Sequence, residues 1–304
     1  MDLIFLGTPA FAVPTLEKII EAGHKVLTVI TQPDRPKGRG HVLATSPVKD
    51  AASRHGLPVF QPERIRRPEI VEWLAAHKTD AMIVVGYGQI IPQAIIDLPR
   101  HGIINVHASL LPKYRGAAPV QWAIANGETV SGVTTMRIDA GLDTGDMLLR
   151  AETPIDDDET AVELGVRLAD LGADLLVETL ARIDSITPEK QDSSQATLAP
   201  ILKKEDGHVD WGRPRQEILN RIRGFAPWPG CYGFWRGMRF HIWKAIPARQ
   251  DLAPGELCTV GRQLFVGCSD DAIEVLELQL EGKRRMTAAE FLSGRGFSHG
   301  EVIE

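Results

Sequence analysis

An asparagine and a histidine stand two residues apart in the segment Asn105-Val106-His107, which ends an apolar run typical of a buried β-strand. Side chains alternate between the two faces of a strand, so Asn105 and His107 are expected on the same face. The amide is a hydrogen-bond donor and the imidazole can carry a proton, a pair that suits a developing oxyanion. A histidine at a strand end is by itself more often a structural residue, so the prediction depends on what else lies nearby.

A second loop supplies carboxylates. The segment from Asp139 to Asp146 contains three acids and two glycines, and it follows another apolar run, Val133–Ile138. The glycines allow sharp turns, and adjacent strands of one sheet could bring a carboxylate to the imidazole, where it would orient the ring and stabilise its charged form. Because this set lacks a serine or cysteine nucleophile, it predicts direct transfer of an acyl group to an amine.

The loop from Gln32 to Ser46 is basic. It contains Gly38-Arg39-Gly40, and the stretch from Thr31 to Lys49 carries a net charge of +3. Connections of this length without secondary structure are uncommon and often functional. A basic loop beside the edge of a sheet suits a phosphate-rich substrate, although a solvated surface loop would have the same composition.

The elements that must position these residues are strands and helices in alternation, which predicts an α/β fold with a Rossmann-like open parallel sheet. The predicted strands are Leu3–Leu6, Lys25–Thr31, Ala81–Val85, Ile103–Val106 and Val133–Ile138. The predicted helices are Phe11–Glu21, Val48–Arg54, Glu69–Ala76, Ala118–Ala125 and Glu159–Arg182. Ser46 before Pro47 is a typical helix start. Ligands of such folds bind at the carboxyl ends of the strands, where Asn105 and His107 are expected.

The last third of the chain differs from the rest in composition and in hydrophobic periodicity. Residues 188–205 are polar and lack periodicity, so we interpret them as a linker after a catalytic domain at residues 1–187. Residues 206–304 begin with a short helix at Arg215–Arg223 and continue in β-like runs, which predicts a small OB-like β-barrel. Thr287 and Glu290 fit a capping box that starts a last short helix. The predicted runs are Tyr232–Trp235, Arg239–Ala245, Leu264–Cys268 and Ala272–Leu280.

The composition is that of an ordinary globular protein. The chain has 304 residues, 43% of them hydrophobic, and a net charge of −6. Its three cysteines are too few and too scattered for a disulfide framework or a zinc site, and no apolar stretch is long enough to span a membrane. We therefore expect a cytoplasmic protein without a bound metal.

The negative net charge argues at first against a nucleic-acid partner, but the charge is unevenly distributed. The stretch from Arg150 to Asp184, mostly one helix, carries −7, whereas Asp206–Arg249 carries +5. Tryptophans are interleaved with those basic residues and could stack on bases, although barrel cores more commonly bury them. These tryptophans are Trp211, Trp228, Trp235 and Trp243. The distribution leaves room for an acidic protein with a basic side that binds nucleic acid.

Four segments together resemble the methionyl-tRNA formyltransferases: Thr31–Gly40, Asn105–Pro112, Arg115–Pro119 and Gly141–Asp146. The resemblance runs from Leu3 into the β-rich end and so covers nearly the whole chain. Within it, the Asn–His pair, the Ser-Leu-Leu-Pro turn and the aspartate loop are shared by all folate-dependent formyltransferases. The basic loop and the additional C-terminal domain narrow the match to the tRNA enzymes.

The resemblance implies transfer of the formyl group of 10-formyltetrahydrofolate to the amino group of methionyl initiator tRNA by a monomer of the formyltransferase fold. It implies that Asn105, His107 and Asp143 are the catalytic residues. The implied folate-binding residues are Ser109, Leu110, Leu111, Pro112, Val85, Gly86, Tyr87, Gly88 and Gln89. The predicted tRNA-binding residues are Arg35, Lys37, Arg39, Arg221 and Arg223.

Three other kinds of protein remain open. A nicotinamide dehydrogenase would need a glycine-rich fingerprint, and the turn Gly7-Thr8-Pro9 lacks its spacing. A formyltransferase acting on a nucleotide sugar or a purine precursor would share the Asn–His–Asp set but not the basic loop and barrel. A non-catalytic RNA-binding protein would have no need of the Asn–His–Asp set.

Overall fold

The structure is a computed structural model that describes residues 1–37, 42–293, 297 and 300–304. The chain forms two compact units, each assembled from several stretches. The first unit comprises Met1–Gly116, Ser131–Thr153 and Gly165–Leu198. The second comprises Ala117–Val130, Pro154–Leu164 and Ala199–Glu304. None of the described helices is long and apolar enough to cross a membrane.

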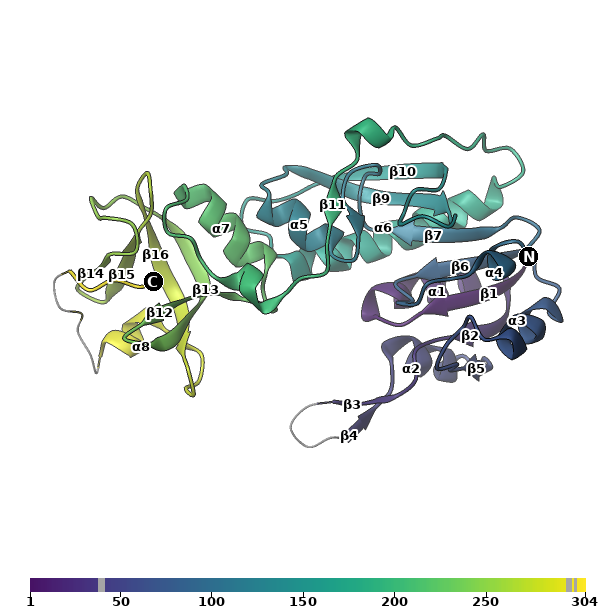
Figure 1. The fold of residues 1–304 in the computed structure, drawn as a ribbon, viewed down its shortest axis with the longest axis horizontal. Helices are drawn as coiled ribbons and strands as arrows, with labels where there is room; N and C mark the ends of the chain where they lie inside the picture. Colours follow the sequence, from purple (N-terminus) through teal and green to yellow (C-terminus); the bar gives the residue numbers. More distant parts are fainter. Residues whose placement is uncertain (38–41, 294–296, 298–299) are drawn as a thin grey trace. The chain divides into compact units, whose positions relative to one another are not determined.

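The first unit is built on a seven-stranded sheet in the order β10-β9-β7-β6-β1-β2-β5 (Figure 1). Strands β5, β2, β1, β6 and β7 run parallel to one another. The strands are β1 Asp2–Gly7, β2 Lys25–Ile30, β5 Val59–Phe60, β6 Ala81–Val85, β7 Ile103–His107, β9 Val130–Arg137 and β10 Met147–Pro154. Strand order reverses at β1, so the carboxyl ends of β1 and β6 form the edge where ligands of open α/β sheets bind.

Strand β9 runs antiparallel to β7, which corrects the prediction of a wholly parallel sheet. Thr134 lies opposite His107 and Arg137 opposite Ile104, so β9 ends beside the start of β7. The prediction failed because β9 is buried on both faces, so its sequence lacks the alternation of apolar and polar residues that would mark an antiparallel strand. The aspartate loop therefore does not begin at the carboxyl edge of β7, as a parallel strand would have placed it.

The helices of the sequence prediction are present, with small shifts at their ends. They are α1 Val13–Glu21, preceded by a 3₁₀ turn at Ala10–Ala12, α2 Pro47–Arg54, α3 Pro68–Ala75, α4 Gln93–Ile96, α5 Pro119–Ala125 and α6 Ala161–Ala181. Short α4 and strand β10 were not predicted. The predicted start of α2 is confirmed, because the Ser46 hydroxyl accepts a hydrogen bond from the backbone N–H of Lys49.

The predicted basic loop contains a short hairpin. Strands β3 (Arg35–Lys37) and β4 (Val42–Ala44) pair antiparallel, which corrects the prediction of a loop without secondary structure. Two strands of three residues each leave almost no periodic signal in a sequence. Arg39 lies outside the described residues.

The predicted linker also has structure. Strand β11 (Leu198–Ala199) pairs with β8 (Arg115–Gly116), and 3₁₀ turns form at Ser193–Gln195 and Lys204–Gly207. The linker was predicted to lack regular structure because its composition is polar. Its ordered segments instead depend on hydrogen bonds to distant parts of the chain.

The second unit combines helices α5, α7 (Arg215–Gly224) and α8 (Ala288–Leu292) with an antiparallel sheet. Helix α7 packs on α5, where Gly224 allows the close approach: a Cβ there would lie 2.9 Å from the backbone nitrogen of Ala125. The sheet order is β12-β13-β16-β15-β14, with β17 paired to β16. The strands are β12 Cys231–Trp235, β13 Met238–Ala248, β14 Leu257–Val260, β15 Gln263–Gly267, β16 Ala272–Leu280 and β17 Met286–Thr287.

No closed barrel is found among the described strands of this sheet. The last residues of the chain lie along both of its edges, because Glu304 exchanges backbone hydrogen bonds with Phe234 of β12 while Leu257 of β14 donates one to Glu301. Helix α8 (Ala288–Leu292) begins with the predicted capping box between Thr287 and Glu290. The unit therefore has the predicted antiparallel β content, with an open path of paired strands.

Candidate active site

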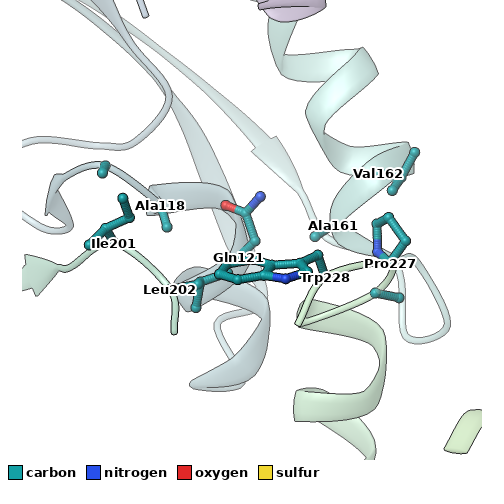
Figure 2. A pocket seen from close by; sticks show the side chains of 10 residues that line it. Ala118, Gln121, Ala161, Val162, Ile201, Leu202, Pro227 and Trp228 are labelled. Atoms are coloured by element: carbon teal, nitrogen blue, oxygen red, sulfur yellow. The ribbon is translucent and has the colours of Figure 1, made fainter. Parts of the chain in front are cut away.

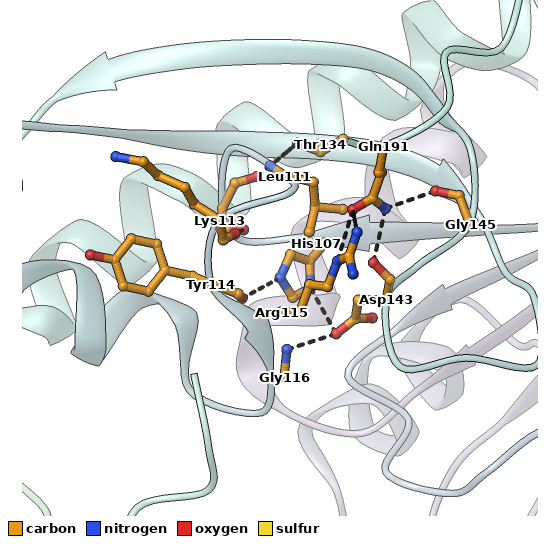
Figure 3. A network of polar contacts seen from close by, with 11 residues as sticks. His107, Leu111, Lys113, Tyr114, Arg115, Gly116, Thr134, Asp143, Gly145 and Gln191 are labelled. Carbon is orange, nitrogen blue, oxygen red and sulfur yellow. Dashed lines mark hydrogen bonds and ion pairs between the residues drawn. The ribbon is translucent and has the colours of Figure 1, made fainter. Parts of the chain in front are cut away.

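The ring of His107 lies at the end of β7 and has a polar group near each of its two nitrogens (Figure 3). Its Nε2 lies 2.9 Å from the backbone oxygen of Tyr114. A carbonyl oxygen accepts hydrogen bonds only, so Nε2 carries a proton and donates it there. The other nitrogen, Nδ1, faces Asp143 at 3.7 Å from Oδ2, a distance of ion pairing and too long for a hydrogen bond. Nδ1 is therefore the nitrogen that can exchange a proton with a substrate.

The carboxylate of Asp143 is fixed by its backbone and by its oxygen Oδ2. Oδ2 accepts a hydrogen bond of 2.9 Å from the backbone N–H of Gly116. Asp143 has φ of +50°, in the left-handed region that a non-glycine residue rarely adopts. Such a conformation persists where the surroundings hold it in place. The predicted approach of a carboxylate from this loop to the imidazole is present in the structure, and Asp143 is the residue that makes it.

Asn105 lies on β7 two residues before His107, opposite Met136 of β9, and the residue is 8% exposed. No hydrogen bond joins its side-chain amide to another residue in the part of the chain that the structure describes. His107 is 6% exposed. A nearly buried amide with unused donors beside an imidazole can bind a carbonyl oxygen whose negative charge grows during a reaction.

The turn Ser109-Leu110-Leu111-Pro112 follows directly after β7 and is fixed by Thr134 of β9. The Thr134 hydroxyl donates to the backbone oxygen of Ser109 at 2.7 Å and accepts from the N–H of Leu111 at 3.1 Å. The Ser109 hydroxyl donates to the backbone oxygen of Lys113 at 2.6 Å. This predicted folate-binding turn is thus a rigid wall beside His107.

The other predicted folate-binding segment, Val85 to Gln89, follows β6. Gly86 and Gly88 both have positive φ, which places two sharp turns within five residues. The backbone oxygen of Tyr87 accepts hydrogen bonds from the Thr8 hydroxyl and the Gln32 amide, so the ends of β1, β2 and β6 are tied together. The Tyr87 hydroxyl is buried without a partner in the described structure, and burial raises its pKa above the usual value.

Gln89 completes this segment by binding the residues after β5. Its Oε1 accepts from the N–H of Ile65 at 2.8 Å, and its Nε2 donates to the backbone oxygen of Pro62 at 3.3 Å. The segment therefore lies at the carboxyl edge of the parallel strands with its backbone held in place. The structure brings Val85–Gln89 to the edge that the fold uses for ligands.

Two residues of the predicted linker join this site, and the sequence prediction missed both. The side-chain amide of Gln191 binds Arg115, Asp143 and Gly145 (Figure 3). The hydroxyl of Thr197 accepts a hydrogen bond of 2.9 Å from the N–H of Tyr114. No motif or periodicity marks either residue, because their role depends on a pairing between segments about 80 residues apart.

The base of the basic hairpin is neutralised by acids. The Lys49 ammonium binds Asp34, and the bonds from Lys49 and Gln61 hold the pKa of Asp34 below its usual value. Arg35 pairs with Glu63 at 3.0 Å, but its side chain stays 68% exposed. Lys37 ends strand β3. The positive charge of this region is therefore smaller at the base than the sequence count implied.

Arg221 and Arg223 on α7 are already bound within the second unit. Arg221 donates to the backbone oxygen of Asp206 at 2.8 Å. Arg223 donates to the backbone oxygens of Asp156 and Glu159, at 3.0 and 3.2 Å, and burial lowers the pKa of its guanidinium. The structure does not place these two residues of the predicted tRNA-binding set as free surface cations.

A surface hollow of about 340 Å³ lies in the second unit. Figure 2 shows the indole of Trp228 and the amide of Gln121 side by side in it, between apolar side chains that include Leu202 and Val162. Trp228 is 51% exposed, whereas Trp211 and Trp235 are buried in the core of the unit. Trp243 is partly buried, stacked on His241 and close to Arg285. Of the four tryptophans considered as platforms for bases, Trp228 is thus the most exposed.

Comparisons with known proteins agree with this geometry. Residues 1–180 match the family model of formyl transferases, and residues 201–296 match that of the formyl transferase C-terminal domain. The chain is 60% identical to the methionyl-tRNA formyltransferase of Solibacter usitatus over 100% of this chain and 98% of that protein. It is 61% identical to the methionyl-tRNA formyltransferase of Koribacter versatilis over 97% of this chain and 96% of that protein.

A solved structure shares the fold at low identity. The N-formyltransferase of Helicobacter canadensis, solved in complex with folinic acid and dTDP-3-aminofucose, superposes with a TM-score of 0.67 at 19% identity, covering 93% of this chain and 99% of that one. From the two family models and the full-length relatives, we conclude that the chain belongs to the methionyl-tRNA formyltransferase family.

Proposed function

We propose that the protein transfers the formyl group of 10-formyltetrahydrofolate to the amino group of methionyl initiator tRNA, producing N-formylmethionyl-tRNA for translation initiation. The observation that carries the proposal is the arrangement of Asn105, His107 and Asp143 at the end of β7. This set suits acyl transfer to an amine and includes no covalent nucleophile. Family membership then supports a formyl group as the acyl group and methionyl-tRNA as the amine.

The folate donor is proposed to bind along the carboxyl edge of the sheet, between the turn Ser109–Pro112 and the segment Val85–Gln89. Two observations support this location: both segments are held rigid by hydrogen bonds, and both follow parallel strands at the edge used by ligands. The structurally similar N-formyltransferase of Helicobacter canadensis was solved with folinic acid, a folate. The formyl carbon would then lie within reach of His107.

The reaction begins with the amino group of the methionyl ester. A free α-amino group has a pKa of about 8, so a useful neutral fraction exists near pH 7. Its lone pair attacks the formyl carbon and forms a C–N bond, and the formyl oxygen becomes an oxyanion. The amide of Asn105 and the protonated Nδ1 of His107 donate hydrogen bonds to this oxygen.

Collapse of this intermediate breaks the bond to N10 of the folate. One proton leaves the attacking nitrogen, and one proton is delivered to N10, so the products are the formyl amide and tetrahydrofolate. Because Nε2 of His107 is bound to Tyr114, a second proton on Nδ1 makes the ring cationic, and Asp143 stabilises that charge across 3.7 Å. Asp143 thereby orients the ring and supports the proton transfer.

For the tRNA substrate, we propose that residues 1–187 carry catalysis, residues 188–205 connect, and residues 206–304, as an OB-like domain, bind tRNA. The C-terminal residues support the OB-like assignment, because this one segment makes backbone hydrogen bonds with both edge strands of the sheet, β12 and β14. Arg35 and Lys37 of strand β3, together with Arg39, are proposed to bind phosphates. Arg221 and Arg223 have the least support in this set, because their guanidinium groups already bind backbone oxygens.

Incubation with 10-formyltetrahydrofolate and charged tRNA tests the proposed function. We expect methionyl initiator tRNA to be formylated much faster than methionyl elongator tRNA, with tetrahydrofolate released in equal amount. An amino sugar attached to dTDP serves as the control acceptor and should remain unmodified. Formylation of neither tRNA, or of the amino sugar alone, would contradict the proposal.

A further inference from the structure

We propose that Gln191 is a positioning residue that sets the carboxylate of Asp143 against the imidazole of His107. The inference deepens the proposed function and rests on it. Gln191 lies in the segment between the two family-model matches, outside both of them. Its amide contacts neither His107 nor the turn Ser109–Pro112, so it acts through the residues that hold them.

Both ends of the Gln191 amide are used. Nε2 donates to the backbone oxygens of Asp143 and Gly145, each at 2.8 Å. Oε1 accepts from Nε and Nη2 of Arg115, at 2.9 and 2.8 Å. Arg115 is 7% exposed, and these two bonds meet its buried guanidinium. One side chain thus joins the aspartate loop to the loop that follows β7.

The loop that Gln191 grips through Arg115 is the one that holds both catalytic groups. The backbone oxygen of Tyr114 accepts from Nε2 of His107, and the backbone N–H of Gly116 donates to Oδ2 of Asp143. Three consecutive residues, 114 to 116, therefore bind the histidine, Gln191 and the aspartate in turn. A shift of Arg115 would move both partners of the His107–Asp143 pair (Figure 3).

An amide is the side chain that this position requires. It must accept from a cation on one side and donate to two carbonyl oxygens on the other, and a carboxylate can perform only the first task. Without the two donated bonds, Asp143 would lose the contact that holds its backbone at φ of +50°. The Asp143 carboxylate would then drift from His107, and a misplacement of about 1 Å can cost roughly 10²-fold in rate.

A double-mutant cycle tests this role. Gln191→Ala should lower kcat by about 10- to 100-fold with little change in KM for the folate. In the Asp143→Ala background the same substitution should cost much less, about 2- to 3-fold, because the carboxylate is gone and only the indirect hold on His107 through Arg115 remains. A residue that merely stabilises the fold would cost the same factor in both backgrounds, and that result would overturn the inference.

Gln191→Glu separates the two ends of the amide. Glu keeps an acceptor for Arg115 but cannot donate to Asp143 and Gly145, so it should lose activity as Gln191→Ala does. If Gln191→Glu had normal kcat, the contact with Arg115 alone would be sufficient and the inference would be wrong. Gln195→Ala is the matched control, because Gln195 lies in the same segment, is exposed and binds Asp192. It should retain full activity.

A second readout is independent of formyl transfer. The ¹⁵N resonances of the His107 ring report its protonation and contacts, and Gln191→Ala should shift them while Gln195→Ala does not. Unchanged ring resonances in a folded Gln191→Ala protein would overturn the inference even if the native protein formylates tRNA. Conversely, shifted resonances in a protein without formyl transfer would support Gln191 as a positioning residue and contradict the proposed function alone.

Discussion

The end of β7 and helix α7 both carry residues that the sequence marked as functional, but the structure treats them differently. At the end of β7, hydrogen bonds hold His107 and Asp143 in place, while Nδ1 and the Asn105 amide remain available. On α7, the guanidinium groups of Arg221 and Arg223 are occupied by backbone oxygens of the same unit. The number of charged residues in a region is therefore a poorer guide to ligand binding than the number of their hydrogen-bonding groups that have no partner within the protein.

The difference has a physical cause. Residues 105–116 are fixed through backbone atoms and through side chains that do no chemistry, such as Thr134 and Gln191. The atoms that take part in the reaction can then remain without hydrogen-bond partners, because the surrounding hydrogen bonds keep them in position. Arg223 instead donates hydrogen bonds to the carbonyl oxygens of two residues just before α6. Its charge supports the fold of the second unit.

The largest expected effect comes from removing the proton carrier. His107→Ala should lower kcat by about 10²–10⁴-fold, because both the proton transfer and one oxyanion donor are lost. Folate affinity should stay near that of the native protein. Steady-state formylation and folate titration measure the two quantities. His101→Ala is the control, because His101 lies just before the start of β7, and this variant should keep its activity. Equal losses of activity in both variants would contradict a specific catalytic role of His107.

Asn105→Ala should lower kcat by about 10²–10³-fold, which is the typical effect of deleting one oxyanion donor. The amide makes no hydrogen bond within the described chain, so the midpoint of thermal unfolding should change little. Formylation assays and thermal unfolding of the same preparation provide the measurement. A large loss of stability with normal kcat would show that Asn105 is structural, as Arg223 is.

Arg223→Ala should destabilise the protein by about 1–3 kcal/mol, because two backbone oxygens lose a charged hydrogen-bond donor. Urea unfolding measures this change. Arg213→Ala is the matched control, since Arg213 is exposed and pairs with acids on the surface, and it should cost less than about 1 kcal/mol. At low salt, the tRNA affinity of a folded Arg223→Ala protein should be unchanged. A uniform loss of affinity would instead place a phosphate on Arg223.

The smallest effect is expected on the hairpin. Arg35→Ala should leave kcat unchanged and reduce the slope of log Kd against log salt concentration by about one, the loss of one phosphate contact. Glu63→Ala removes the ion-pair partner of Arg35 and should leave this slope unaltered or steeper. Filter binding of tRNA at several salt concentrations measures this slope for the native protein and for both variants. Identical slopes for native protein and Arg35→Ala would remove Arg35 from the tRNA-binding set.

Much of the fold could be predicted from the sequence because its signals are local. Buried strands such as Ala81–Val85 are runs of apolar residues. Ser46-Pro47 and Thr287 with Glu290 mark helix starts through contacts within one turn. The direction of β9 could not be predicted, because a strand covered on both faces has the same composition in a parallel and an antiparallel sheet.

The sequence by itself determined the catalytic candidates: alternation along β7 puts Asn105 and His107 on one face, and the aspartate loop follows as a compact motif. Tertiary structure alone decided how they are held. The contact from Asp143 to His107 and the hydrogen bonds from Gln191 to two loops join segments far apart in the chain. The bond from His107 to Tyr114 depends on how the turn between them folds back. Such contacts follow from the path of the backbone, and residue type and spacing carry no record of them.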